Sequence, residues 1–269
     1  MIGIEWIVAF LVLGAVVGFM AGLLGIGGGG IMVPTLSTIF LAQGVPVDQV
    51  VHLALGTSMA SIVMTSFASM RAHKSHQTIL WDVFKMMAGG IVIGTFAATF
   101  LAAYLKSIQL AIFFSIFMAY VSIQMARDTK PKPSREIQSP KTLFVAGSFI
   151  GIISALVSIG GGSLTVPYLV WQNVDLKKAI GTSAAIGFPL SIAGTVGYIV
   201  NGMGSVSASS ELVLGFVYLP AVIIISAVSF FTAPLGARMA HKLPVPKLKK
   251  VFALLLMVLS IKMLTSIVA

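Results

Sequence analysis

The sequence has no cysteine and very few charged residues. Of its 269 residues, 9% are charged and 58% are hydrophobic, and the mean hydropathy is +1.05. Soluble domains carry about 25% charged residues, so this chain has too few to cover a water-facing surface. The absence of cysteine excludes disulfides, thiol catalysis and thiolate metal sites. We therefore expect an integral membrane protein without a resident metal or cofactor.

Acidic residues are missing from the middle of every apolar run. All seven map to ends or loops: Glu5, Asp48, Asp82, Asp128, Glu136, Asp175 and Glu211. Proton-coupled carriers usually expose a carboxylate or histidine inside the membrane, and hard divalent cations need carboxylate oxygens. A buried-carboxylate relay and a divalent-cation carrier are both disfavoured. Coupling to Na+ or H+ and uncoupled movement of an anion stay open.

Ten apolar segments account for most of the chain. They are 4–25, 31–42, 50–70, 83–105, 107–126, 142–159, 164–173, 178–200, 212–236 and 247–268. The runs are continuous rather than alternating, which predicts helices and not the strands of a membrane barrel. A full span needs about 20 residues, so 31–42 and 164–173 are too short to cross unaided. We predict an all-α membrane protein with about 8–10 transmembrane segments.

Two phrases of the sequence occur twice. Ile26-Gly-Gly-Gly-Gly-Ile-Met-Val-Pro-Thr-Leu36 matches Ile159-Gly-Gly-Gly-Ser-Leu-Thr-Val-Pro-Tyr-Leu169 at an offset of 133 (159 − 26). Ala54-Leu-Gly-Thr-Ser58 matches Ala179-Ile-Gly-Thr-Ser183 at an offset of 125 (179 − 54). Two ordered pairs of phrases indicate internal duplication. The predicted parts are an N-terminal repeat at 1–126, a linker at 127–141 and a C-terminal repeat at 142–269.

The net charge of +10 comes from basic residues in loops, which favours a membrane topology signal over nucleic-acid binding. Four clusters should be cytoplasmic, around Arg71 and Lys74, in the linker, around Lys177 and Lys178, and from Arg238 to Lys250. The poorly charged loops at 43–49 and 201–211 and both termini should then lie outside. With five segments in each half, the second repeat is inverted relative to the first. Inverted repeats are the plan of many secondary transporters.

Consecutive glycines in the doubled phrase predict broken helices at a binding site. Each glycine in a helix costs about 1 kcal/mol relative to alanine. A helix that starts after such a break offers free N–H groups and a positive dipole end to an anion. The proline of each Val-Pro pair should lie early in the short helix. The predicted substrate-binding residues of the two phrases are Gly27, Gly28, Gly29, Gly160, Gly161, Gly162 and Ser163.

The alternative for glycines is close helix packing. We favour packing for the glycines at four-residue spacing, which are Gly14, Gly18 and Gly22, Gly90 and Gly94, and Gly147 and Gly151. Hydroxyls of the second phrase can also reach the same cavity or bond within their own helix. These candidates are Thr57, Ser58, Thr182 and Ser183.

The paired Gly-Gly-Gly-x-x-x-Val-Pro phrases, each followed by Gly-Thr-Ser, resemble the sulfite exporter family of the TauE/SafE type over nearly the whole chain. The resemblance implies a multi-pass permease of the cell inner membrane that carries sulfur-containing anions such as sulfite, sulfoacetate or other organosulfonates. A secondary transporter working by alternating access is the first hypothesis. An anion channel with the glycine-rich helix ends as a static filter is the alternative. We expect no enzyme and no nucleic-acid partner, and the oligomeric state stays open.

Overall fold

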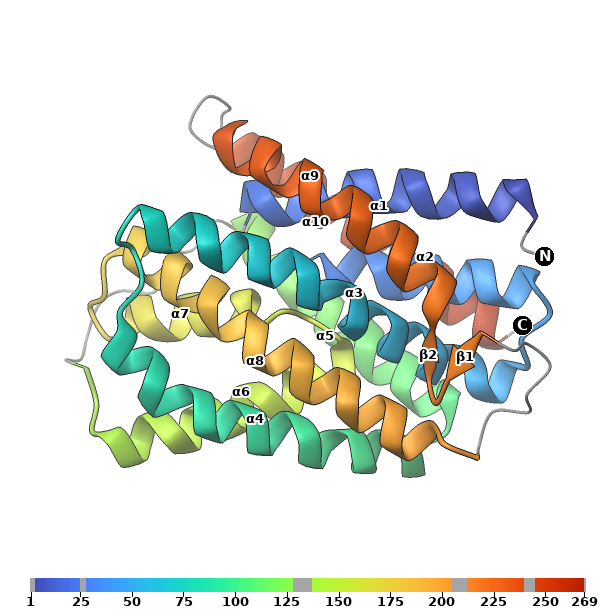
Figure 1. Ribbon diagram of the computed structural model, residues 1–269, viewed down its shortest axis with the longest axis horizontal. Helices are drawn as coiled ribbons and strands as arrows, with labels where there is room; N and C mark the ends of the chain where they lie inside the picture. The colour runs from blue at the N-terminus through green and yellow to red at the C-terminus, as the bar shows by residue number, and fades with distance from the viewer. Residues whose placement is uncertain (1–2, 25–27, 128–136, 205–211, 240–244, 269) are drawn as a thin grey trace.

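A computed structural model describes residues 3–24, 28–127, 137–204, 212–239 and 245–268. They form ten helices and one short hairpin of strands (Figure 1). The helices are α1 (Ile4–Leu24), α2 (Gly29–Ala42), α3 (Val47–Ser75), α4 (Trp81–Tyr104), α5 (Ser107–Arg127), α6 (Pro140–Val157), α7 (Gly162–Trp171), α8 (Leu176–Gly202), α9 (Leu219–Met239) and α10 (Val245–Val268), and the strands are β1 (Val213–Leu214) and β2 (Val217–Tyr218).

The predicted fold class is confirmed. Eight of the described helices are long and apolar enough to cross a membrane. The other two are α2, with 14 residues, and α7, with 10, and they are the two short segments that follow the glycine runs. The predicted linker lies between the end of α5 and the start of α6, and its residues 128–136 are outside the described part of the chain.

The helices pair in a pattern that repeats when the two halves are exchanged. The most extensive contacts are α4 with α6 and α1 with α9, which are equivalent if α1 to α5 correspond to α6 to α10. The pairs α4 with α8 and α9 with α3 are likewise equivalent, and α3 with α8 and α5 with α10 each join corresponding helices. Each half therefore completes its packing on the other half, as expected for two interlocked repeats.

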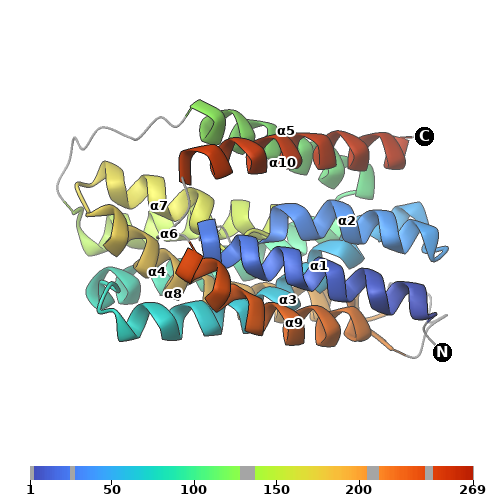
Figure 2. The same cartoon turned by 90° about the horizontal axis from the view of Figure 1, so that it is seen from above.

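Both ends of the described chain lie at one end of the helix bundle. In Figures 1 and 2 the first helix begins and the last helix ends on the right, while α5 ends and α6 begins on the left. Corresponding helices thus run in opposite directions. We call the first side the terminus end and the second the linker end. The C-terminal ends of α3 and α9 and the N-terminal end of α8 also lie at the linker end, and Lys74, Arg238 and Lys177 belong to these helix ends.

Most of the glycines at four-residue spacing pack helices together, as predicted, whereas Gly22 of the same set lines a cavity instead. A Cβ on Gly14 would lie 2.9 Å from the carbonyl oxygen of Ile225 on α9. A Cβ on Gly147 would lie 2.6 Å from the carbonyl oxygen of Met87 on α4. The two contacts are equivalent under the exchange of halves. Backbones approach this closely only where a side chain is absent.

One apolar segment has a different structure from the one predicted. Residues 212–236 read as a continuous helical run, but Val213–Leu214 and Val217–Tyr218 pair as antiparallel strands and helix α9 begins at Leu219. Gly215 turns the hairpin at a positive φ of 56°. Its backbone lies directly against the carbonyl of Ile199 on α8, so the hairpin covers the end of that helix.

Candidate functional site

Both glycine phrases break a helix at the same internal position. Gly28 precedes α2 with φ 75° and ψ −12°, and Gly161 precedes α7 with φ 78° and ψ −20°. This left-handed conformation costs other residues roughly 1–2 kcal/mol, so glycine is suited to both positions. On the other side of the second break, α6 ends at Val157, and its C-cap residue Ser158 is also left-handed. The predicted breaks are therefore present at equivalent points; Gly27 lies outside the described residues.

The two breaks lie back to back in the centre of the molecule. A Cβ on Gly29 would fall on the carbonyl oxygen of Ser158, so the first turn of α2 rests on the chain between α6 and α7. The hydroxyl of Ser158 donates to the carbonyl of Leu55 on α3 at 3.1 Å, and Ser158 is fully buried. Glycine at position 29 permits this contact between the repeats because its hydrogen leaves room for a carbonyl.

Each short helix starts with N–H groups that have no acceptor within the helix. The carbonyl of Gly28 takes the N–H groups at positions 31 and 32, and the carbonyl of Gly161 takes those at positions 164 and 165. Positions 29 and 30 in α2, and 162 and 163 in α7, precede the first intrahelical bonds. The chain thus provides two equivalent pairs of backbone donors, at the positive ends of two helix dipoles.

The prolines lie later in the short helices than we expected. Because α2 begins at Gly29 and α7 at Gly162, Pro34 and Pro167 each occupy the second turn instead of the first. A proline there supplies no N–H to the carbonyl four residues earlier. The carbonyls affected are those of Gly30 and Ser163, so each break also gains a carbonyl oxygen that lacks its helical partner.

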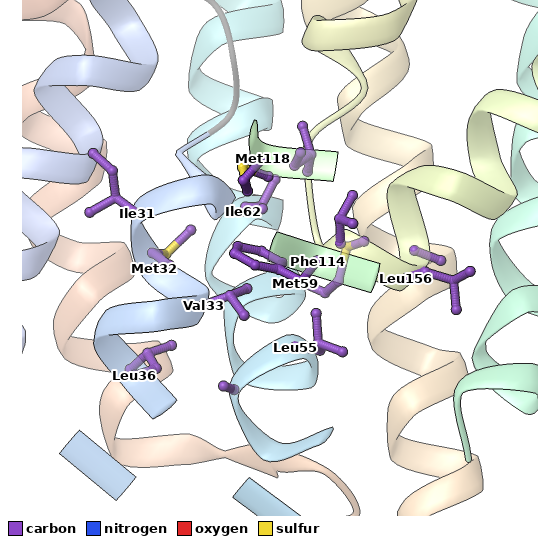
Figure 3. Packing of buried hydrophobic residues seen from close by; sticks show 14 of the residues in the cluster. Ile31, Met32, Val33, Leu36, Leu55, Met59, Ile62, Phe114, Met118 and Leu156 are labelled. Carbon is purple, nitrogen blue, oxygen red and sulfur yellow. The ribbon is translucent and has the colours of Figure 1, made fainter. Parts of the chain in front are cut away.

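The N-terminus of α2 faces a buried apolar cluster. A Cβ on Gly30 would lie 2.9 Å from Leu256 on α10 and 3.1 Å from the sulfur of Met118 on α5. Figure 3 shows the buried side chains of this region. It labels Ile31, Met32, Val33 and Leu36 of α2, Leu55, Met59 and Ile62 of α3, Phe114 and Met118 of α5, and Leu156 of α6. The first turn of α2 therefore borders hydrocarbon at Gly30 and a backbone carbonyl at Gly29.

The Gly-Thr-Ser phrase of the first repeat holds the chain that enters α9. The hydroxyl of Thr57 accepts a hydrogen bond from the backbone N–H of Tyr218 at 3.0 Å. At the preceding position of α3, a Cβ on Gly56 would collide with the carbonyl of Phe216. Gly56 lets the backbone at Phe216 approach α3. Thr57 then accepts the N–H of Tyr218, two residues after Phe216.

The phrase of the second repeat does the same for α4. Thr182 accepts the backbone N–H of Leu80 at 2.9 Å, and a Cβ on Gly181 would collide with Thr78. Leu80 corresponds to Tyr218 at an offset of 138 (218 − 80), and Thr78 corresponds to Phe216 at the same offset (216 − 78). Thr57 and Thr182 therefore fasten the start of the fourth helix of the opposite repeat, a contact that links the halves.

Thr57→Val and Thr182→Val should lower stability by similar amounts. Each leaves a backbone N–H without its acceptor, at a cost of about 1–3 kcal/mol. Thr195→Val is the control, because among the described residues the Thr195 hydroxyl bonds only to the carbonyl of Ser191 within α8. Thermal unfolding of the purified protein in detergent measures the effect. Equal melting temperatures for all three variants would contradict the linking role.

Ser58 and Ser183, the third residues of the phrases, have buried hydroxyls with no hydrogen-bond partner among the described residues. Ser183 precedes Ile186 by three residues and Leu190 by seven, so the three share one face of α8. A Cβ on Gly161 would lie 3.8 Å from Ile186 and 3.5 Å from Leu190, which places this face against the second break. Ser163, in the first turn of α7, is likewise unpaired.

A cavity of about 40 Å³ extends from the second break toward the linker end. Its wall is built mostly from small residues of α1, α3, α8 and α9, together with Gly160 of the second break. Those lining it are Ala21, Gly22, Thr65, Ser66, Ala68, Ser69, Ala72, His73, Gly160, Ala184, Ala233 and Pro234. Gly160 is the only predicted site residue that lines it. The other described candidates lie around the breaks or in the contacts between repeats.

Sequence reasoning missed the contribution of α3 to this cavity. Thr65 and Ser66 lie at its buried end, and Ser69 and His73 follow toward the linker end. Their spacing of three and four residues marks one helical face. A stripe of small polar residues on an otherwise apolar span was the available signal, but its neighbours could not be named before the fold was known.

Comparison with known proteins gives consistent results. The family model of the sulfite exporter TauE/SafE matches residues 10–263. The chain belongs to the sulfite exporter TauE/SafE family. It is 38% identical to a probable membrane transporter protein of Haemophilus influenzae over 96% of this chain and 98% of that one. It is also 27% identical to a probable membrane transporter protein of Methanocaldococcus jannaschii over 94% of each chain. No solved structure matches.

The TauE/SafE assignment, together with the eight apolar helices, makes this protein a multi-pass membrane transporter. The predicted family is confirmed. The family and its relatives are described as transporters rather than as enzymes, in agreement with the expectation that the chain is not an enzyme.

Proposed function

We propose that this TauE/SafE protein is a secondary transporter that exports a small sulfur-containing anion, such as sulfite or an organosulfonate, by alternating access. The observation that carries the proposal is the pair of broken helices in central contact, one of which borders a cavity. Sulfite and sulfonates present three oxygens that accept hydrogen bonds. The donors at the starts of α2 and α7, with Ser58, Ser163 and Ser183, match such a group without a fixed positive charge.

The proposed binding residues are the glycines and hydroxyls at the two breaks. Gly28, Gly29, Gly161 and Gly162 set the backbone so that N–H groups stay free of side chains, and Gly160 borders the route to the anion. Thr57 and Thr182 would not contact the anion, because their hydroxyl oxygens already accept backbone N–H groups. They would hold the neighbouring helices in position.

Export is the direction that the charges favour. By the positive-inside rule, we expect the linker end, with its basic residues, to lie in the cytoplasm and both termini to lie outside the inner membrane. The cavity would then load from the cytoplasm. A membrane potential that is negative inside expels an anion with about 2.3 kcal/mol per charge for each 100 mV. A sodium gradient is a second possible driving force, because the carbonyls of Gly30 and Ser163, which lack their helical partners, could bind Na+.

Purified protein in proteoliposomes tests the proposal. Labelled sulfite, sulfoacetate and sulfate are compared, with a potassium diffusion potential imposed in either direction and with or without a sodium gradient. We expect saturable uptake of one sulfur oxyanion, counterflow by the unlabelled anion and acceleration when the receiving side is positive. Absence of transport for every sulfur anion would contradict the substrate class. Currents far above carrier turnover would instead favour the anion channel.

A further inference from the structure

The two halves differ where their third helices face the bundle interior. Four residues between positions 68 and 73 of α3 line the cavity, and all four are half-buried. Their counterparts in α8, at the offset of 125, are residues 193–198. Ala193 is 7% exposed and Tyr198 only 1% exposed. The route from the breaks is therefore open toward the linker end, while the corresponding route toward the terminus end is packed with side chains.

A methionine fills the counterpart of the cavity. Ala184 lines the open side, and its counterpart in the first repeat is Met59 (184 − 59 = 125). Met59 is fully buried. Its sulfur would be 3.0 Å from a Cβ on Gly194, the residue that corresponds to Ser69 of the cavity wall. Met59 thus occupies the volume that Ala184 leaves empty at the other end.

A hydrogen bond closes the same end. The hydroxyl of Tyr198 on α8 donates to the carbonyl of Ala155 on α6 at 2.9 Å. The counterparts are His73 on α3 (198 − 73 = 125) and Gly22 on α1 (155 − 22 = 133). Both of these line the open cavity, and the His73 side chain is hydrogen-bonded to Thr78 instead. The contact between α8 and α6 is therefore closed, and the equivalent contact between α3 and α1 is open.

We propose that Tyr198 and Met59 form the gate on the terminus side of the transport pathway. The opposite state would then open the Tyr198–Ala155 contact and bring His73 toward the carbonyl of Gly22. This inference rests on the proposed alternating access and deepens it by naming the contact that is exchanged. Because the halves are inverted, the same relative movement of helices opens one end as it closes the other.

Cysteine accessibility tests the gate without any substrate. The chain has no cysteine, so single variants carry the only thiol. Ala68→Cys reports on the open cavity, and Ala193→Cys reports on its counterpart (193 − 68 = 125). Vesicles of both orientations are treated with a membrane-impermeant maleimide. We expect Ala68→Cys to react from the linker side, and Ala193→Cys to be protected from both sides.

Weakening the gate should expose the second thiol. Tyr198→Phe removes the hydrogen bond and keeps the ring, so labelling of Ala193→Cys from the terminus side should rise about fivefold, equivalent to about 1 kcal/mol for one buried hydrogen bond. Labelling of Ala68→Cys should fall in the same background. Met59→Ala is a second route to the same result if Tyr198→Phe folds poorly.

The outcomes separate the gate from the proposed substrate. The gate is overturned if the thiol of Ala193→Cys stays protected from the maleimide in both the Tyr198→Phe and the Met59→Ala background. Equal labelling of both thiols from opposite sides in the parent chain also overturns it, since a continuous pore would have no closed end. Exposure of Ala193→Cys in the variants supports the gate even where sulfite transport fails, because labelling needs no anion.

Discussion

Gly161→Leu and Gly28→Leu should each reduce uptake of the transported anion by at least about tenfold, which corresponds to about 1.4 kcal/mol in the rate-limiting step. Both glycines hold a left-handed backbone that a leucine adopts only with strain. Gly28 also has no room for a side chain, because a Cβ would collide with Val17 of α1. A shift of either residue turns the first N–H groups of a short helix away from the proposed anion.

The chain supplies matched controls for this experiment. Gly44 and Gly204 are also left-handed, with φ of 83° and 84°, but no heavy atom lies within 4 Å of a Cβ at either position. Gly44→Leu and Gly204→Leu therefore introduce similar backbone strain far from the breaks. Initial rates of anion uptake in proteoliposomes are compared after size-exclusion chromatography confirms folded protein. Rates in Gly161→Leu and Gly28→Leu that equal those of the controls would contradict the site.

Asparagine distinguishes backbone conformation from side-chain bulk. Among residues other than glycine, asparagine tolerates the left-handed region best. The nearest heavy atom to a Cβ on Gly161 is 3.5 Å away, an ordinary contact distance. Gly161→Asn should thus retain more uptake than Gly161→Leu. At Gly28, where Val17 is in the way, the two substitutions should be equally damaging.

The sequence alone predicts the scaffold because hydropathy and duplication are local signals. Each of the ten apolar segments contains a helix, and six of the seven glycines at four-residue spacing pack α1 on α9 and α6 on α4. The hairpin at 213–218 was not predicted, since a short apolar run looks the same in a strand and in a helix. Pro34 and Pro167 fall in the second turn because each short helix begins two residues earlier than the apolar run indicated.

The details of the site depend on contacts between the halves. The roles of Thr57 and Thr182 require a backbone N–H that lies 161 and 102 residues away in the chain, respectively. No spacing rule identifies such partners. The cavity is also invisible in one repeat taken alone, because its walls come from four helices of both halves. The sequence shows at which equivalent positions the two repeats carry different residues. Only the fold shows which of these positions face the cavity.

Exchanging one pair of side chains should invert the side on which the transporter is open. Met59→Ala removes the filling side chain at the terminus end, and Ala184→Met places it in the cavity at the linker end. The two positions correspond at the offset of 125, so the double variant gives each end the side chain of the other. Ala184→Met alone should stop transport, because the cavity of about 40 Å³ has no room for the added thioether.

The double variant conserves the total side-chain volume of the pair, so it should fold better than Ala184→Met alone. A change of about 5.5 kcal/mol would invert a two-state equilibrium completely, and a smaller change shifts the populations in the same direction. Thiol labelling measures the shift: Ala193→Cys should become reactive from the terminus side and Ala68→Cys protected. Unchanged labelling of both positions in a folded double variant would show that Met59 and Ala184 only fill space, and that the two ends are held by other contacts.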